Sequence, residues 1–412
     1  MGANTFILFA ASILAGAYMA WNIGANDVAN SMASAVGAKA ITFAQAVLIA
    51  GVLNIVGATF IGSHVTQTIR KGIVDISTIT DPQLVLIGLL SALMAASLWV
   101  FLATIHALPV STTHSIVGAI VGFGLIVAGP SSINWGKFVS VVFGWILSPI
   151  MSGIAAFLLF RFIERLVLSR LDTLSGAVTI TPLLVAVAFF VMTLSLFMKT
   201  PLSKKLNLSF TGMILIPLAA ALLIYIISYF VLKHLLPRMN ISGSEDIFRY
   251  LQVGTSCYVA LAQGANDVAN AMGPLSGIYF IVTTGSVAAH VAVPTWMLAF
   301  GGIMIAVGIW TWGYRVIETV GSKITELNNS RGFTIDFATA SVILGATMLG
   351  LPVSTTHAAL GAYIGVGFAR GLQSVNLGII GRIIIYWIIT VPVAAATAAA
   401  IYFVLKTIVV GG

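Results

Sequence analysis

Long apolar stretches alternate with short polar connections over the whole chain. Many of the apolar runs reach about twenty residues, which is the length that spans a bilayer as an α-helix. None of the connections is long enough to form a separate soluble domain. The runs lie near residues 4–35, 41–62, 83–107, 109–129, 135–163, 178–199, 209–236, 248–272, 294–314, 333–351, 352–370 and 377–407, with a weaker run at 276–293. The pattern predicts an all-α polytopic membrane protein with about 10–12 transmembrane helices, some of them broken or re-entrant.

Composition supports this fold class. The 412 residues are 59% hydrophobic and only 7% charged, whereas soluble domains carry about 25% charged residues. A transmembrane β-barrel would show alternating segments of about ten residues, and the chain has none. The formal charge of +8 comes from Lys and Arg in the connections, where such residues face membrane surfaces and lipid. We therefore expect no nucleic-acid partner.

Two further features exclude other classes of protein. Cys257 is the only cysteine, so the chain can form no internal disulfide and shows no cysteine metal pattern. The first twenty residues lack the charged start and cleavage site of a removable signal peptide, so the first apolar run is interpreted as a membrane helix.

Two heptapeptides each occur twice, in the same order and at nearly the same spacing. GANDVAN fills residues 24–30 and 264–270, and LPVSTTH fills residues 108–114 and 351–357. Chance does not produce such a pattern, so the chain is an internal duplication. We predict a first repeat at 1–165 and a second at 245–412. Residues 166–244 contain neither word and are expected to form a linking pair of transmembrane helices.

The number of apolar runs predicts how the repeats are oriented. Six runs separate the run that holds Asp27 from the run that holds Asp267. If all of them span the membrane, the two helices run in opposite directions, which is an inverted-topology repeat. One re-entrant hairpin would change this parity. The distribution of Lys and Arg favours an N-terminus outside the cell.

The GANDVAN words place a carboxylate within apolar surroundings. An acid at mid-membrane costs roughly 2.5–3.5 kcal/mol, and the apolar body of these runs holds no Lys or Arg to neutralise Asp27 and Asp267. A small cation with oxygen ligands fits this chemistry. The alternative is that the polar side chains only bond helix to helix, with Gly24 and Gly264 permitting a break or a close approach. The candidate cation ligands are Asn26, Asp27, Asn30, Asn266, Asp267 and Asn270.

The PVSTTH words predict helix starts, because Pro109 and Pro352 suit the first turn of a helix. Free N–H groups and the helix dipole at such a start attract anions. The alternative is that these residues only cap a helix or pack against a neighbour. His114 and His357 could carry protons or bind a ligand, but a hydrogen bond between helices is the more common role. The candidate anion-binding residues are Ser111, Thr112, Thr113, Ser354, Thr355 and Thr356.

Both words together resemble the signature of the inorganic phosphate transporter (PiT) family of sodium- or proton-coupled phosphate symporters. Residues 264–273 match that signature in full, and residues 24–37 look like the first copy in sodium-coupled members. The resemblance implies that Asp27, Asn30, Asp267 and Asn270 serve the coupling cation. It also implies that Ser111 to Thr113 and Ser354 to Thr356 hold phosphate. The implied fold has inverted repeats, and the implied assembly is a dimer of two chains.

We therefore predict a symporter of the cell membrane that couples inward sodium movement to phosphate uptake, with no enzymatic activity and no cofactor. Proton coupling, another oxyanion such as sulfate, and an ion channel remain alternatives. An intramembrane aspartyl protease would also use two membrane aspartates. Its flanks differ from those found here, and it leaves the duplicated STTH words unexplained.

Overall fold

The fold is built from helices. The computed structural model describes residues 3–62, 73–75, 79, 81–199, 206–235, 241, 243–288, 291–348 and 353–411. Within these residues the regular structure is helical, apart from one isolated bridge between Val74 and Ile133. The prediction of an all-α polytopic chain is therefore confirmed.

Eight helices in the described part of the chain are long and apolar enough to cross a membrane. They include the unit formed by α1 and α2 and the unit formed by α7 and the short π-helix η4 (Glu164–Leu168). The α-helices of the described residues, short ones included, are α1 (Ala3–Asp27), α2 (Ala29–Gly37), α3 (Phe43–Ile61), α5 (Pro82–Ile105), α6 (Thr112–Ala128), α7 (Trp135–Ile163), α8 (Thr173–Lys199), α10 (Phe210–Leu235), α11 (Ser244–Thr284), α12 (Thr295–Trp312), α13 (Tyr314–Lys323), α14 (Asn329–Met348), α15 (Thr355–Arg370) and α16 (Leu377–Val410).

Three of the predicted apolar runs differ from the helices that form. The first run is interrupted at Val28, where α1 ends and α2 begins. The runs at 248–272 and 276–293 do not form separate helices, because α11 continues through Pro274 as far as Thr284. The two GANDVAN words therefore lie in different local structures, the first at a helix break and the second inside a continuous helix.

Each STTH word lies at the start of the second helix of a hairpin, in which two consecutive helices pack on each other. In one, α5 leads into α6, which has 17 residues and is shorter than a typical span. In the other, α14 leads into α15, which has 16 residues. Thr112 begins α6, Thr356 lies in the first turn of α15, and both bond to Asp27. The two short helices therefore start close together inside the protein.

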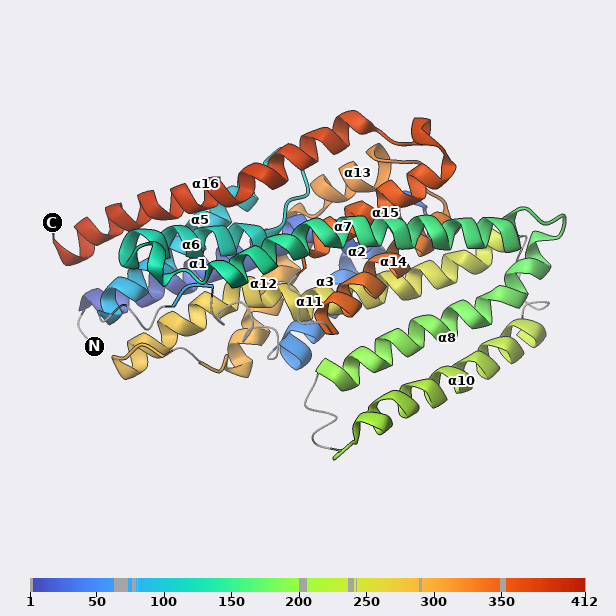
Figure 1. Cartoon of the computed structure of the whole chain (residues 1–412), viewed down its shortest axis with the longest axis horizontal. Helices are drawn as coiled ribbons and strands as arrows, with labels where there is room; N and C mark the ends of the chain where they lie inside the picture. The colour runs from blue at the N-terminus through green and yellow to red at the C-terminus, as the bar shows by residue number, and fades with distance from the viewer. Residues whose placement is uncertain are drawn as a thin grey trace.

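Helices of the two halves pack against each other reciprocally. Helix α1 packs on α12 as α11 packs on α3, and α6 packs on α16 as α15 packs on α7. Figure 1 shows that α1 and α11 run in opposite directions. Glycines allow the closest crossings: a Cβ on Gly24 would lie 1.9 Å from the carbonyl oxygen of Ile305, and one on Gly264 would lie 2.5 Å from that of Asn54.

The small residues of α6 and α15 also serve packing, as their spacing predicts. A Cβ on Gly118 or Gly122 would meet the backbone of α16 at Val391 or Ala395 within 3 Å. On α15, a Cβ on Gly365 would lie 2.1 Å from the carbonyl oxygen of Gly153 in α7. Each short helix is therefore held closely against one long helix.

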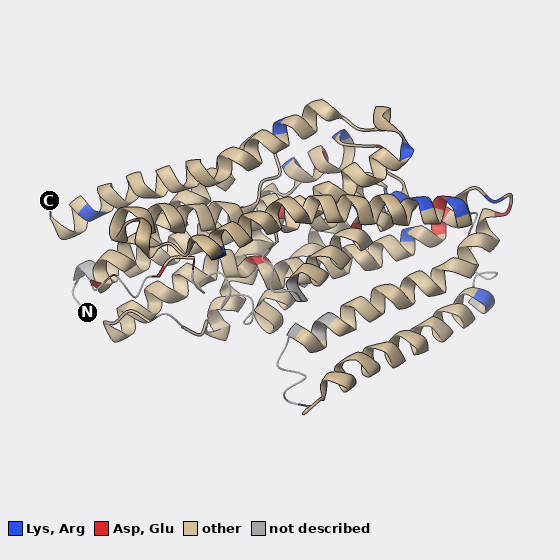
Figure 2. Ribbon diagram, viewed as in Figure 1, with Lys and Arg blue, Asp and Glu red and all other residues tan. Residues whose placement is uncertain are grey.

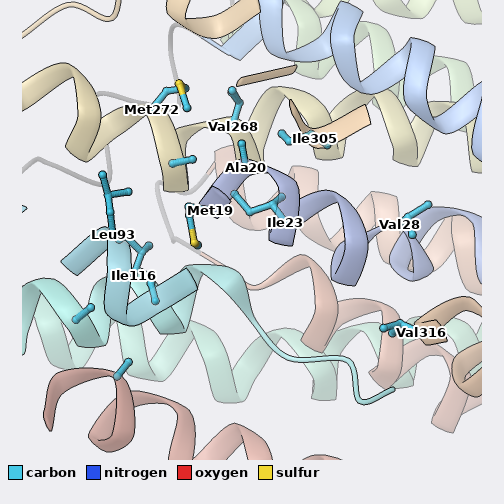
Figure 3. Close-up of a cluster of buried hydrophobic side chains, with 14 of the residues drawn as sticks. Met19, Ala20, Ile23, Val28, Leu93, Ile116, Val268, Met272, Ile305 and Val316 are labelled. Atoms are coloured by element: carbon cyan, nitrogen blue, oxygen red, sulfur yellow. The ribbon is translucent and has the colours of Figure 1, made fainter. Parts of the chain in front are cut away.

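A single apolar core joins the two halves around these crossings. Figure 3 shows Met19 and Ile23 of α1 beside Val268 and Met272 of α11, with Leu93 of α5 and Ile305 of α12 nearby. All six side chains are fully buried. The helices that carry the duplicated words are thus fixed by packing with residues from both repeats.

Helices α8 and α10 lie at the edge of the bundle and pack on each other (Figure 1). Helix α10 exposes Leu215, Leu222 and Phe230, each by more than half. An exposed apolar face of this kind suits the lipid hydrocarbon. These are the two helices of the segment that was predicted to link the repeats.

Charged residues gather at the end of the bundle where α7 ends and α11 begins (Figure 2). The loop between α13 and α14 lies at the same end, because Asn328 bonds to Glu245. The end of α15 joins it through the ion pair of Arg370 with Glu326, at 3.1 Å. The apolar middle of the protein therefore has a charged boundary on one side.

Candidate functional site

The first GANDVAN word is shaped by the break between α1 and α2. Asp27 is the last residue of α1, and Asn30 lies in the first turn of α2. Asp27 is fully buried and Asn30 is 5% exposed. The break thus presents a carboxylate and an amide to the interior, where neither can be hydrated by bulk water.

The second word lies inside α11 and presents its polar groups on the turns of an intact helix. Asp267 and Asn270 are fully buried, whereas Asn266 is half-buried. Thr112 bonds to Asp27 of the first word and to Asn270 of the second. The duplicated words therefore belong to one site.

Serines cap the two short helices. The Ser111 hydroxyl accepts from the His114 N–H at 3.2 Å, and the Ser354 hydroxyl accepts from the His357 N–H at 3.3 Å. Both predicted helix starts are present. In these two contacts the serine oxygen accepts a backbone hydrogen bond, which is helix capping as the alternative interpretation expected. Each capping oxygen keeps its own hydrogen, which can still be donated. The prediction that Pro109 lies in the first turn of a helix is wrong, because α6 begins at Thr112 and Ser111 is its cap. Pro352 lies outside the described residues.

The two kinds of word meet at Asp27. Thr112 of α6 donates to Asp27 Oδ2 at 2.7 Å, and Thr356 of α15 lies 3.4 Å from Asp27 Oδ1. The Thr356 hydroxyl is also 3.3 Å from the carbonyl oxygen of Val110 and has one hydrogen to give to either acceptor. Asp27 thus links the starts of both short helices.

The asparagines of the words connect opposite repeats. Asn30 donates to Thr356 at 2.9 Å and lies 3.5 Å from the Thr355 hydroxyl. In the mirrored arrangement, Asn270 lies 3.1 Å from Thr112 and 3.2 Å from Thr113. Each pair of threonines is therefore ordered by an amide from the other half of the chain.

Within the second GANDVAN word, which the structure describes in full, two buried acceptor oxygens have no hydrogen-bond donor. They are Oδ2 of Asp267 and Oδ1 of Asn270. A buried acceptor without a donor costs about 1–3 kcal/mol, and two oxygens one turn apart suit a hard cation. This chemistry fits the expectation that Asp267 and Asn270 hold a coupling ion.

Asn26 and Asn266 differ in their contacts. Asn26 Nδ2 donates to the Thr104 hydroxyl at 2.9 Å and to the Leu108 carbonyl at 3.1 Å. Its Oδ1 accepts from the Val110 N–H at 3.0 Å. Asn266 instead donates to Asp267 Oδ1 at 3.0 Å. Asn26 is thus committed to the hairpin of α5 and α6, and it has only one remaining lone pair for a cation.

The histidines serve helix packing. His357 Nδ1 lies 3.2 Å from the carbonyl oxygen of Trp145 on α7, which is the predicted bond between helices. The ring of His114 lies 3.6 Å from the ring of Trp145, and the ring of His357 lies 3.7 Å from the ring of Trp387. The two imidazoles meet edge to face with 4.3 Å between their ring centres. The histidines therefore secure the short helices just behind the threonines.

A third buried carboxylate, Asp336 of α14, escaped the sequence analysis. It accepts from Ser34 at 2.7 Å and from Ser256 at 2.5 Å, so it joins α2, α11 and α14. The signal was available, because Asp336 lies within the apolar run at 333–351. It differs from the other two acids in having no duplicate in the first repeat.

A narrow cavity between α11 and α14 was also not anticipated. It reaches Asn30 and Thr355 of the site and passes Gln263. Both amide atoms of Gln263 are buried without a partner. The candidate site therefore borders a small space between these two helices.

Comparisons with known proteins agree with this arrangement. The model of the phosphate transporter family matches residues 23–398. A Pyrococcus abyssi protein that carries the provisional name phosphate permease is 51% identical over 395 residues, covering 96% of this chain and 97% of its own. The chloroplastic inorganic phosphate transporter 2-1 of Arabidopsis thaliana is 41% identical over 428 residues, covering 97% of this chain and 72% of its own. A solved structure titled as the sodium-dependent phosphate transporter superposes with a TM-score of 0.89 at 44% identity, covering 98% of this chain and 100% of that one.

Proposed function

The chain belongs to the phosphate transporter family, and from this premise we propose that it is a secondary active symporter that couples inward sodium movement to phosphate uptake. Membership and the apolar helices make it a multi-pass membrane transporter and not an enzyme. Sodium as the coupling ion is supported by the sodium-dependent neighbour, at 44% identity. The cell membrane is its proposed location.

One observation carries the proposal: both short helices start at the carboxylate of Asp27, through Thr112 and Thr356. In our proposal, phosphate binds beside these starts, where free N–H groups and hydroxyls donate to an oxyanion. The proposed phosphate-binding residues are Ser111, Thr112, Thr113, Ser354, Thr355 and Thr356.

Sodium makes such an anion site compatible with two buried acids. Asp267 and Asn270 offer unpartnered oxygens, and Asp27 with Asn30 offers a second set close to the threonines. A cation at each set offsets the repulsion between phosphate and the carboxylates, which is strong where the dielectric constant is low. Binding of the two species is therefore mutually dependent, and the loaded site carries little net charge.

Uptake by purified protein in liposomes tests the proposal. An inward sodium gradient should drive accumulation of labelled phosphate, and Asp27→Asn or Asp267→Asn should abolish it. Excess sulfate should compete poorly if the substrate is phosphate. Accumulation driven by a pH gradient with no sodium present would reject sodium as the coupling ion. Single-channel currents would reject coupled transport altogether.

The proposed transporter contacts membrane lipid and forms a homodimer. The exposed apolar face of α10 supports contact with lipid. A homodimer is proposed from the family resemblance. Cross-linking in native membranes tests the dimer, and a product with the mass of one chain only would reject it.

A further inference from the structure

We propose that Asn26 and Asn266 are alternating latches, each of which holds its own helical hairpin closed while the other hairpin is open. This inference rests on the proposed transport function and assigns the two asparagines a positioning role in place of cation binding. It follows from a difference between the two halves of the chain at positions that the duplication makes equivalent.

The first hairpin is latched. Asn26 bonds to the Thr104 hydroxyl, the Leu108 carbonyl and the Val110 N–H, so its amide joins α1 to both sides of the turn between α5 and α6. The side chain is fully buried. Three hydrogen bonds from one amide in a dry interior make a firm but reversible connection.

Among the described residues of the second hairpin, no contact of Asn266 corresponds to this connection. Asn266 is the equivalent residue in the second word, and Val353 is the equivalent of Val110 in the second STTH word. Asn266 donates to the neighbouring Asp267 instead, and it is half-buried where Asn26 is fully buried. The same residue type is thus committed to the hairpin in one repeat and turned to its own helix in the other.

The cavity lies on the side of the unlatched hairpin. Its walls are Tyr258, Val259, Ala262 and Gln263 of α11 with Thr339, Ala340, Ile343 and Leu344 of α14, and it reaches Asn30 and Thr355. Helices α11 and α14 both begin at the charged boundary (Figure 2). Along α11 the cavity therefore lies between this boundary and the second GANDVAN word.

The equivalent space in the first repeat is filled. Asn22 and Ile23 of α1 correspond to Ala262 and Gln263, and both are fully buried. Ser97 and Val100 of α5 correspond to Ala340 and Ile343 and are also fully buried. Aromatic stacking closes this space further, because the ring of Tyr18 lies 6.0 Å from the ring of Trp21 and 5.9 Å from the ring of Phe101.

Inverted repeats reach the opposite-facing state by exchanging their conformations. In that state Asn266 turns from Asp267 to the Val353 N–H, and α14 closes on α11. Asn26 releases the first hairpin, and a cavity opens between α1 and α5. Because Asn266 leaves Asp267 when it latches, closure of the second hairpin removes a donor from that carboxylate and favours a bound cation there.

Cysteine labelling of the protein in nanodiscs tests the exchange, with Cys257→Ser as the background. Ala340→Cys reports on the cavity beside the second hairpin, and Ser97→Cys is its matched partner in the closed space. In the parent protein, a small methanethiosulfonate reagent should react with Ala340→Cys faster than with Ser97→Cys. Asn26→Ala should raise the Ser97→Cys rate about fivefold, as expected from the loss of buried hydrogen bonds in one of two states, and should lower the Ala340→Cys rate.

Control variants keep this result interpretable. Asn266→Ala should leave Ala340→Cys reactive and Ser97→Cys protected. If Asn26→Ala unfolds the protein, both probes will react faster. Thr104→Val then distinguishes unfolding from release of the latch, because valine has the shape of threonine but cannot accept from Asn26. It should raise the labelling rate of Ser97→Cys and lower that of Ala340→Cys.

The outcomes also separate this inference from the transport proposal. Unchanged labelling in Asn26→Ala and Thr104→Val, together with loss of sodium-dependent phosphate binding in Asn26→Ala, would overturn the latch and make Asn26 a cation ligand. If the parent protein bound no phosphate in sodium, the transport proposal would fail. The opposed labelling shifts would still establish the latch.

Discussion

Thr112 donates a 2.7 Å hydrogen bond to Asp27, and this contact joins the two repeated words of the first half. The same hydroxyl lies 3.1 Å from the amide nitrogen of Asn270, which comes from the second half. One threonine therefore connects an acid of one repeat with an amide of the other. Changes at this residue should affect the cation and the anion together.

Thr112→Val should weaken sodium-dependent phosphate binding about tenfold, because a hydrogen bond to a charged group contributes about 1.5–3 kcal/mol. Valine keeps the shape of threonine but cannot donate to Asp27. Thr112→Ser keeps the hydroxyl and should bind almost as the parent does. Equilibrium binding of labelled phosphate measures both. Equal loss in the two variants would show that the methyl group matters and the hydroxyl does not.

Thr356→Val should have a smaller effect than Thr112→Val. The Thr356 hydroxyl is 3.4 Å from Asp27 and shares its one hydrogen between that carboxylate and the Val110 carbonyl, so less interaction energy is lost. The comparison uses the same binding measurement. A larger loss of phosphate affinity in Thr356→Val than in Thr112→Val would contradict this ranking. It would show that the hydrogen-bond distances to Asp27 do not determine how much each threonine contributes to phosphate binding.

Gly264→Ala should destabilise the protein by about 1–3 kcal/mol, because extra atoms in a packed core force the structure apart. The new Cβ would lie 2.5 Å from the Cα and carbonyl oxygen of Asn54 on α3. Gly254 lies on the same helix with nothing within 4 Å of a built Cβ, so it is the matched control. Gly254→Ala should be neutral or stabilising by about 0.5–1 kcal/mol. Thermal unfolding in detergent compares the two, and equal melting temperatures would contradict the close crossing.

Asp336→Ala should lower stability by about 2 kcal/mol, because the hydroxyls of Ser34 and Ser256 lose a buried acceptor. Ser256→Ala removes only one of the two donors and should have a smaller effect. Thermal unfolding again provides the measurement. A melting temperature for Asp336→Ala at or above that of the parent would show that the buried carboxylate is retained for a reason other than stability.

The duplicated words made much of the site predictable from the sequence. Two acids in apolar runs need a partner, and Pro-Ser-Thr motifs favour helix starts. These local rules anticipated the serine caps and the polar character of the site. The pairing of Asn30 with Thr356, and of Asn270 with Thr112, could not be predicted, because it depends on how distant helices cross.

The hairpins and the helix break were less accessible to sequence reasoning. An apolar run does not reveal whether it crosses the membrane or turns back, since both are buried in low-polarity surroundings. The break at Val28 has no proline or glycine at that residue. It occurs in one copy of an identical heptapeptide and not in the other, so tertiary packing determines it. The commitment of Asn26 to the first hairpin follows from the same packing.

The most direct test of the account is the affinity for phosphate measured with and without sodium in the purified protein. Phosphate should bind at least about tenfold more tightly in sodium than in choline at equal ionic strength, which is an ordinary coupling free energy between two sites. Asp27→Asn should lose most of that difference, because the carboxylate that links cation and anion is gone. Equal phosphate affinity in sodium and choline for the parent protein would contradict the claim that the two duplicated words form one shared, ion-dependent site.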